Sequence, residues 1–253
     1  MAEEGIFVWG QNNFGQLGTG NTTPPRVPEK ITSLSPNQIV DISFGNEHSL
    51  AATIDGELYS WGRNNDSRLG QGVGDKTDRH TPTRVSSLSH VKAVQVSAGQ
   101  QFSVVLTSEG QVFSFGQNDE GQLGHGDTRS RDIPEEIKSL PSNITFISVG
   151  AAHSLALTKE SGEVWAWGQN TYGQIGAGHN NAQLIPVKVS LPSKIISIAC
   201  GGVFSGALSE EGKLFLWGYS GHGELGQGST PNKNVPQEVP LNEKVIQFTC
   251  GYN

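Results

Sequence analysis

The chain has 253 residues, a formal net charge of −7 at pH 7 and a pI near 5.5. This acidic balance, with no block of Lys or Arg, argues against direct binding of nucleic acid or of an anionic membrane surface. No apolar run approaches the ~20 residues of a membrane-spanning helix, and residues 1–5 lack the basic and apolar regions of a signal peptide. We therefore expect a cytoplasmic location, with the nucleus as the alternative.

An aromatic residue followed by glycine returns five times, at Trp9, Trp61, Phe115, Trp167 and Trp217, in steps of 52, 54, 52 and 50 residues. A Gly-Gln-Leu-Gly sequence follows each pair, with Ser67-Arg68-Leu69-Gly70 as its most divergent copy. Self-similarity at this period indicates a solenoid, a propeller or an array. We predict a single repeat array over residues 1–253, with approximate units 5–55, 56–109, 110–161, 162–211 and 212–253, the last incomplete.

Within one repeat the pattern predicts four short strands. Apolar residues alternate at 147–149 and again at 155–157, the period of a half-buried strand. Ser161-Gly162 then predicts a hairpin turn, because glycine tolerates the positive φ that such turns require. The third strand ends at Trp167, and the Pro186–Val189 run predicts a fourth strand at an outer edge, where proline is tolerated.

Four antiparallel strands in ~50 residues is the sheet of a propeller blade, and helical periodicity is absent. The 33 glycines and the 34% hydrophobic content fit such short strands and tight turns. We therefore predict an all-β propeller of four-stranded antiparallel blades. The five aromatic residues of the aromatic-glycine pairs are expected to pack between neighbouring blades.

The successive motifs resemble the regulator of chromosome condensation repeat. They comprise the Pro-x-x-Val run, a Gly-x-x-His-Ser corner such as Gly150–Ser154, the acidic-Gly turn and the Gly-Gln-Leu-Gly loop. The resemblance covers essentially the whole chain and implies a β-propeller, seven-bladed where it closes. Seven units need roughly 360 residues, whereas this chain carries about 4.8 units. We therefore expect an incomplete propeller of about five blades, and favour a truncated seven-bladed propeller over an open arc.

Two sequence features that suggest chemistry have simpler structural explanations. Gly221–Gly226 satisfies the dinucleotide pattern Gly-x-Gly-x-x-Gly, but that pattern requires a following helix, whereas here it belongs to a recurring loop. His48 and His153 share a repeat position with Phe102 and Phe204, so they are expected to be packed corner residues. No zinc spacing or catalytic triad stands out. We expect no catalytic residues, no metal, no cofactor and no small-molecule substrate, so the protein is predicted not to be an enzyme.

Cys200 and Cys250 occupy the same position in successive repeats, each directly before a glycine. The position holds Phe44, Ala98 and Val149 elsewhere, which indicates a small apolar core position. A disulfide between the two is therefore not expected, and a reducing compartment fits.

The residues that vary between repeats suggest where a partner binds. Antiparallel strand order places the Gly-x-x-His corners and the Gly-rich loops on one face, which we call the loop face, and the acidic-Gly turns on the opposite turn face. Variable side chains on a rigid repeat scaffold commonly build a binding surface. The candidate partner-binding residues are Asn46, Glu47, Arg63, Arg68, Gln100, Gln101, Asp119, Glu120, Tyr172, Tyr219 and His222.

These features favour a non-enzymatic protein-interaction propeller with a regulatory or scaffolding role. The resemblance also implies an alternative, a guanine-nucleotide exchange factor for a Ran-type small GTPase. The family's important position before the corner histidine holds Glu47, Gln101, Ala152 and Val203, of which only Glu47 is acidic. The family's GTPase-contacting insertion and basic N-terminal tail are absent. Relatives carry these repeats within ubiquitin ligases and kinases, so a regulatory module of such an enzyme is a further alternative.

A relative with a different activity, the plant ultraviolet-B photoreceptor, uses tryptophans inside the Gly-x-x-His corners. Here four tryptophans belong to aromatic-glycine pairs, and the fifth, Trp165, lies in the strand before one. The sequence therefore disfavours photoreception.

Overall fold

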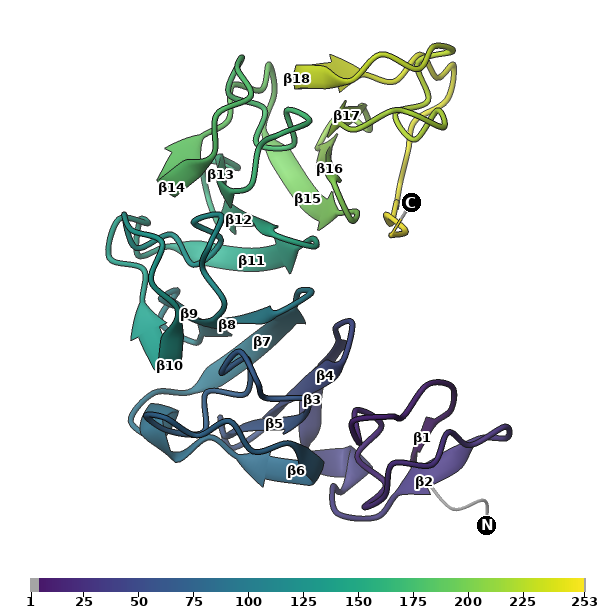
Figure 1. Cartoon of the computed structure of the whole chain (residues 1–253). Coiled ribbons are helices and arrows are strands. Elements are labelled where there is room, and N and C mark those ends of the chain that lie inside the picture. The colour runs from purple at the N-terminus through teal and green to yellow at the C-terminus, as the bar shows by residue number, and fades with distance from the viewer. Residues whose placement is uncertain (1–4, 253) are drawn as a thin grey trace. The chain divides into compact units, whose positions relative to one another are not determined.

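The computed structural model describes residues 5–252, and this part of the chain consists of strands and loops apart from two single-turn 3-10 helices (Figure 1). Residues 1–4, on which the signal-peptide expectation partly rests, and Asn253 lie outside the described residues. The two helical turns are η1 (Pro36–Gln38) and η2 (Ser86–Leu88), and neither is long or apolar enough to cross a membrane.

Eighteen strands are found within residues 5–252, and they form one two-stranded and four four-stranded sheets. The sheets are β1 (Ile6–Val8) with β2 (Glu29–Ile31); β3 (Ile39–Phe44), β4 (His48–Thr53), β5 (Leu58–Gly62) and β6 (Arg79–Arg84); β7 (Ala93–Ala98), β8 (Phe102–Thr107), β9 (Val112–Gly116) and β10 (Arg131–Glu136); β11 (Ile144–Val149), β12 (His153–Thr158), β13 (Val164–Gly168) and β14 (Gln183–Lys188); and β15 (Ile195–Cys200), β16 (Phe204–Ser209), β17 (Leu214–Gly218) and β18 (Lys233–Glu238). The predicted four-stranded antiparallel blade is thus confirmed.

The chain divides into two compact units. The first comprises residues 5–117 and 130–136 and contains β1 to β10; the second comprises residues 118–129 and 137–252 and contains β11 to β18. The sequence repeats begin at the hairpin turn in the middle of a sheet. Each complete sheet therefore takes its first two strands from one sequence repeat and its last two from the next.

Every complete sheet is an antiparallel meander. The first strand ends at the Gly-x-x-His or Gly-x-x-Phe corner and the third at the Gly-rich loop, so both lie at the same end of the sheet. His153 faces Gly168 in this register. A Cβ on Gly168, whose φ is +99°, would lie 2.5 Å from the Ala152 carbonyl oxygen, which explains why glycine follows the aromatic residue. Pro186 lies in the edge strand β14, as its missing N–H requires.

The buried tryptophans join successive repeats. In the second unit, the Nε1–H of Trp167 donates to the Gln122 carbonyl and that of Trp217 to the Gln174 carbonyl, both at 2.9 Å. Trp61 bonds the Gln16 carbonyl in the same way in the first unit. Each tryptophan therefore covers the Gly-rich loop of the preceding repeat, as predicted for a residue between blades.

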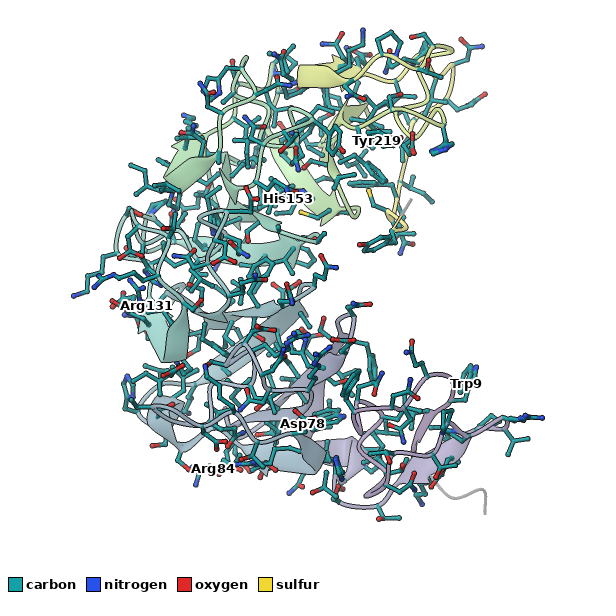
Figure 2. The ribbon with its side chains drawn as sticks, viewed as in Figure 1. Trp9, Asp78, Arg84, Arg131, His153 and Tyr219 are labelled. Carbon is teal, nitrogen blue, oxygen red and sulfur yellow. The ribbon has the colours of Figure 1, made fainter. Side chains whose placement is uncertain are left out.

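Trp9 departs from this expectation, because 63% of it is exposed (labelled in Figure 2). The equivalent residues Trp61, Phe115, Trp167 and Trp217 are 0% exposed. Within the described residues no Gly-rich loop precedes Trp9 along the chain. The repeat position alone does not guarantee burial, since the neighbouring repeat supplies the other half of the contact.

The corner histidines also join successive repeats. The Nε2 of His153 lies 3.0 Å from Ser205 Oγ, and Ser205 donates its own hydrogen to the Gln174 carbonyl at 2.7 Å. The Ser205 hydroxyl can therefore only accept from the ring, so His153 carries a hydrogen on Nε2. Burial lowers the pKa of His153 to about 4, which keeps the ring neutral at physiological pH. His48 and Ser103 repeat this arrangement at 2.9 Å. Both rings are fully buried, as expected of packed corner residues.

The position shared by the two cysteines lies at the margin of the core: Cys200, Cys250 and Ala98 pack against buried clusters without being fully buried. Phe44, its first occupant, is 49% exposed, and Cys200 and Cys250 are only partly buried as whole residues. Both thiols are free. Burial raises the pKa of Cys250 to about 12, and that of Cys200 is raised as well, chiefly by burial. Both sulfurs are therefore neutral thiols at physiological pH, which makes them poor nucleophiles.

Candidate functional site

The Gly-rich loops of the loop face are held by a buried asparagine. In one of them, Asn118 accepts the Leu123 N–H at 2.9 Å and donates to the carbonyls of Asp127 at 2.9 Å and Arg129 at 3.0 Å. Asn12, Asn64 and Asn170 make corresponding bonds, and Ser220 takes the position in the fifth repeat. These residues were not singled out from the sequence, although recurrence at one repeat position was the available signal. They make the loops a rigid support for the variable side chains.

Variable side chains from successive repeats meet in pairs on this support. Arg63, directly after an aromatic-glycine pair, lies with its guanidinium carbon 4.5 Å from the centre of the Phe14 ring. Tyr219, at the equivalent position, lies 5.0 Å from the Tyr172 ring at an interplanar angle of 68°. In both pairs the second residue comes four positions after the glycine of the preceding repeat. The loop face is therefore built from side chains contributed jointly by adjacent repeats.

In the first unit, five side chains form a charged network that we call the Arg68 cluster. It contains Glu47, Arg63, Asp66, Arg68 and Gln101. Arg68 donates to Glu47 Oε2 at 3.3 Å and to Asp66 Oδ2 at 2.5 Å. Arg63 donates to the same Glu47 oxygen at 2.9 Å, and Gln101 donates to the same Asp66 oxygen at 3.2 Å. The cluster thus links two corners and one Gly-rich loop.

Arg68 was expected on the surface with the other candidates, but its side chain is 0% exposed. In three of the other four repeats this position is glutamine, and the Gln16, Gln122 and Gln174 side chains accept a backbone N–H within their own loop. Arginine has no acceptor, so Arg68 instead reaches Glu47, Asp66 and the Gln100 carbonyl, the last at 3.0 Å. Arg68 can therefore act on a partner only through the side chains that it holds.

Replacing Arg68 with methionine is expected to lower the free energy of unfolding by about 2–3 kcal/mol, because the partly buried Asp66 would lose its cation and Glu47 would keep only Arg63. Arg68→Gln should cost less, since glutamine can accept the Asp66 N–H as its equivalents do in other repeats. Urea unfolding of both variants measures the difference. Equal losses would contradict the role assigned to the guanidinium.

The second unit carries an aromatic group instead. The Tyr219 ring lies 5.0 Å from Tyr172 and 6.1 Å from His222 (Tyr219 is labelled in Figure 2). Glu224 takes the loop-capping position of glutamine and accepts the His222 N–H at 2.9 Å. The two tyrosines are half-buried and His222 is exposed. The structure thus brings together these three predicted residues, which come from two successive repeats.

Four candidates are not among the side chains that define either group. Asn46, Asp119 and Glu120 are exposed, and Gln100 joins the Arg68 cluster only through its backbone carbonyl while its side chain is exposed. Within residues 5–252 no group of three or more His, Cys, Asp or Glu side chains could hold a metal ion.

One constellation in the first unit contains residue types used in catalysis. Lys76 and Asp132 form an ion pair at 3.0 Å, and both contact the hydroxyl of Ser67. Hydrogen bonding from Ser67, and then from the Gly74 N–H, lowers the pKa of Asp132 to about 2. An anion held this firmly is a poor general base. The contact instead ties the loop after β5 to strand β10.

Comparison with solved structures shows which known fold this architecture shares. The structure is similar to the crystal structure of human WBSCR16, with a TM-score of 0.85 and 24% identity over 98% of this chain and 65% of that one. It is equally similar to Prp20p from Saccharomyces cerevisiae, with a TM-score of 0.84 and 24% identity over 98% of this chain and 62% of that one. The fold is therefore that of a β-propeller with about five blades in this chain.

The family follows from the sequence comparison. Residues 5–253 match the RCC1-like domain model, and the chain belongs to this family. It is 38% identical to the ultraviolet-B receptor UVR8 of Arabidopsis thaliana, over 81% of this chain and 47% of the receptor. It is 36% identical to the human probable E3 ubiquitin-protein ligase HERC3, over 71% of this chain and 17% of the ligase. The chain thus spans about half or less of these relatives.

Proposed function

We propose that this chain is a non-enzymatic interaction module that binds a protein partner through its loop face, in a regulatory or scaffolding role. One observation carries the proposal: side chains that differ between repeats meet in pairs on this face, as Arg63 meets Phe14 and Tyr219 meets Tyr172. The buried asparagines beneath them keep the loops rigid, which reduces the entropy lost on binding. Prp20p, which has a similar fold, binds Gsp1p and histones, and this supports protein binding as a use of the fold.

Affinity capture with quantitative mass spectrometry tests this proposal. The bait is the full chain, and the loop-face variants are Tyr219→Gln and Glu120→Lys; glutamine already occupies the Tyr219 position in three other repeats. We expect the same partner on the wild type and on the turn-face control Glu211→Lys, with recovery reduced about tenfold or more by a loop-face variant. Equal recovery on all four baits would contradict binding through the loop face.

A second candidate function is nucleotide exchange on a Ran-like small GTPase. Glu47, the acidic residue of the first complete corner, favours it, and its side chain keeps 19% exposure within the Arg68 cluster. A nucleotide-release assay over a small-GTPase panel tests this, with Glu47→Ala alongside. Acceleration that Glu47→Ala abolishes would support exchange; no acceleration for any GTPase would leave the binding module as the proposal.

A third alternative for the function is a regulatory module derived from a larger ubiquitin ligase or kinase, and the match to part of HERC3 supports it. For each of these functions we propose a cytoplasmic location, with the nucleus as the alternative. Imaging of the tagged chain in cells checks the location.

A further inference from the structure

Arg63 is the single charged residue at its repeat position. The position directly after the aromatic-glycine pair holds Gln11, Gln117, Gln169 and Tyr219 in the other four repeats. Arginine is not needed for the loop to fold, because the same loop forms with neutral residues at this position. The charge at Arg63 therefore calls for another explanation.

The guanidinium of Arg63 is held from two sides. Its Nη1 donates to Glu47 Oε2 at 2.9 Å, and its central carbon lies 4.5 Å from the centre of the Phe14 ring. The Arg63 backbone N–H also donates to the Glu47 carbonyl at 2.9 Å. Glu47 in turn is held by the buried Arg68 at 3.3 Å. The orientation of the group is thus set before any partner arrives, which lowers the entropic cost of binding.

One edge of this guanidinium remains available. Nε and Nη2 present two parallel N–H groups, and neither has a hydrogen-bond partner within residues 5–252. The side chain is 33% exposed, so this part of the loop face reaches solvent. Two parallel donors of this kind match the two oxygens of a carboxylate in a bidentate pair.

Arg63 shares its carboxylate partner with a second arginine. Glu47 Oε2 accepts from both Arg63 and Arg68, so one carboxylate serves two cations. Asp66 contacts Arg68 and Gln101 rather than Arg63. The two arginines and two carboxylates of the Arg68 cluster balance in charge, so the attraction for an incoming carboxylate comes from the two unpaired N–H groups of Arg63.

We propose that Arg63 is the receptor for one carboxylate side chain, an aspartate or glutamate, of the protein partner. The pair forms through Nε and Nη2, while Phe14 and Glu47 hold the guanidinium in place. Glu47 and Arg68 act as positioning residues. This inference rests on the proposed function of the loop face and names the chemistry of its ligand there.

Peptide selection tests it on the full chain. A random peptide library is selected on the wild type and on Arg63→Gln, the residue found at this position in three other repeats. The best wild-type peptide is then synthesised with its acidic residue and with the matching amide, and binding is followed by fluorescence anisotropy. Arg84→Gln is the control, because Arg84 pairs with Glu57 at the turn end of the same sheet (labelled in Figure 2).

Three results are expected together. Acidic residues are enriched at one peptide position on the wild type but not on Arg63→Gln. Either Arg63→Gln or the acid-to-amide change in the peptide weakens binding about 10- to 100-fold, the range for hydrogen bonds between charged groups. The two changes combined weaken binding little further, the coupling expected of a direct contact. Arg84→Gln leaves affinity unchanged.

The contrary outcomes separate the two proposals. Peptides that depend on Tyr219 or Glu120 but bind equally well with the amide would overturn the carboxylate receptor and leave the loop face as the binding surface. Failure to select any peptide, or selection of peptides insensitive to every loop-face variant, would count against both.

Discussion

Replacing Trp167 with alanine is expected to lower the free energy of unfolding by about 3–5 kcal/mol, the usual cost of emptying a large aromatic site. The side chain is 0% exposed, so its removal leaves a cavity inside the fold that solvent does not reach directly. The change also leaves the Gln122 carbonyl without the indole N–H that donates to it at 2.9 Å. Urea unfolding followed by circular dichroism measures the loss.

Trp9→Ala is the matched control, because Trp9 has the same repeat position but is 63% exposed. It should cost less than about 1 kcal/mol, the range of ordinary surface substitutions. Similar losses for the two variants would show that contact with the preceding loop is not what makes the buried tryptophan important.

Acidification from pH 6.5 to 4 is expected to destabilise the protein by about 3 kcal/mol for each corner histidine, at 1.36 kcal/mol per pKa unit. Burial lowers the pKa of His153 to about 4; burial, with the charge of Arg68, lowers that of His48 to about 3, both from 6.5. Between pH 6.5 and 4 these two histidines are therefore largely protonated in the unfolded chain but remain largely unprotonated in the folded chain. Stability is full above pH 6.5 and falls as the pH drops towards the folded-state pKa values.

The double variant His48→Phe/His153→Phe is the control, since phenylalanine occupies this corner position at Phe102 and Phe204. Its free energy of unfolding should decline much less between pH 6.5 and 4. Urea midpoints measured across this range for both proteins give the comparison. Parallel pH profiles would show that the histidines do not govern acid sensitivity.

Much of the fold was predictable because its signals are local. Alternation at 147–149 and 155–157 marks strands, Ser161-Gly162 marks a turn, and Pro186 marks an edge strand, each through the conformational preference of a few consecutive residues. Each of these signals recurs in at least four repeats, which strengthened the prediction. The exclusion of Gly221–Gly226 as a nucleotide loop followed in the same way, and within residues 5–252 the segment is followed by strand β18 rather than by a helix.

The candidate site was predictable only in outline. Antiparallel order places corners and Gly-rich loops at one end of each sheet, and this much follows from counting strands. The contact between Arg63 and Phe14 could not be predicted by counting strands. The two residues belong to different repeats and meet only when one loop packs beside the next. The same holds for Tyr219 and Tyr172.

The sequence by itself thus determined the repeat, its four strands and the end of each sheet that carries the variable loops. Only the tertiary structure decided that Arg68 is buried, that Trp9 is exposed and that Arg63 keeps one edge of its guanidinium without a partner. The physical reason is common to all three. Burial and hydrogen bonding at these positions depend on which side chains the neighbouring repeat supplies. The position of a residue within its own repeat does not specify those side chains.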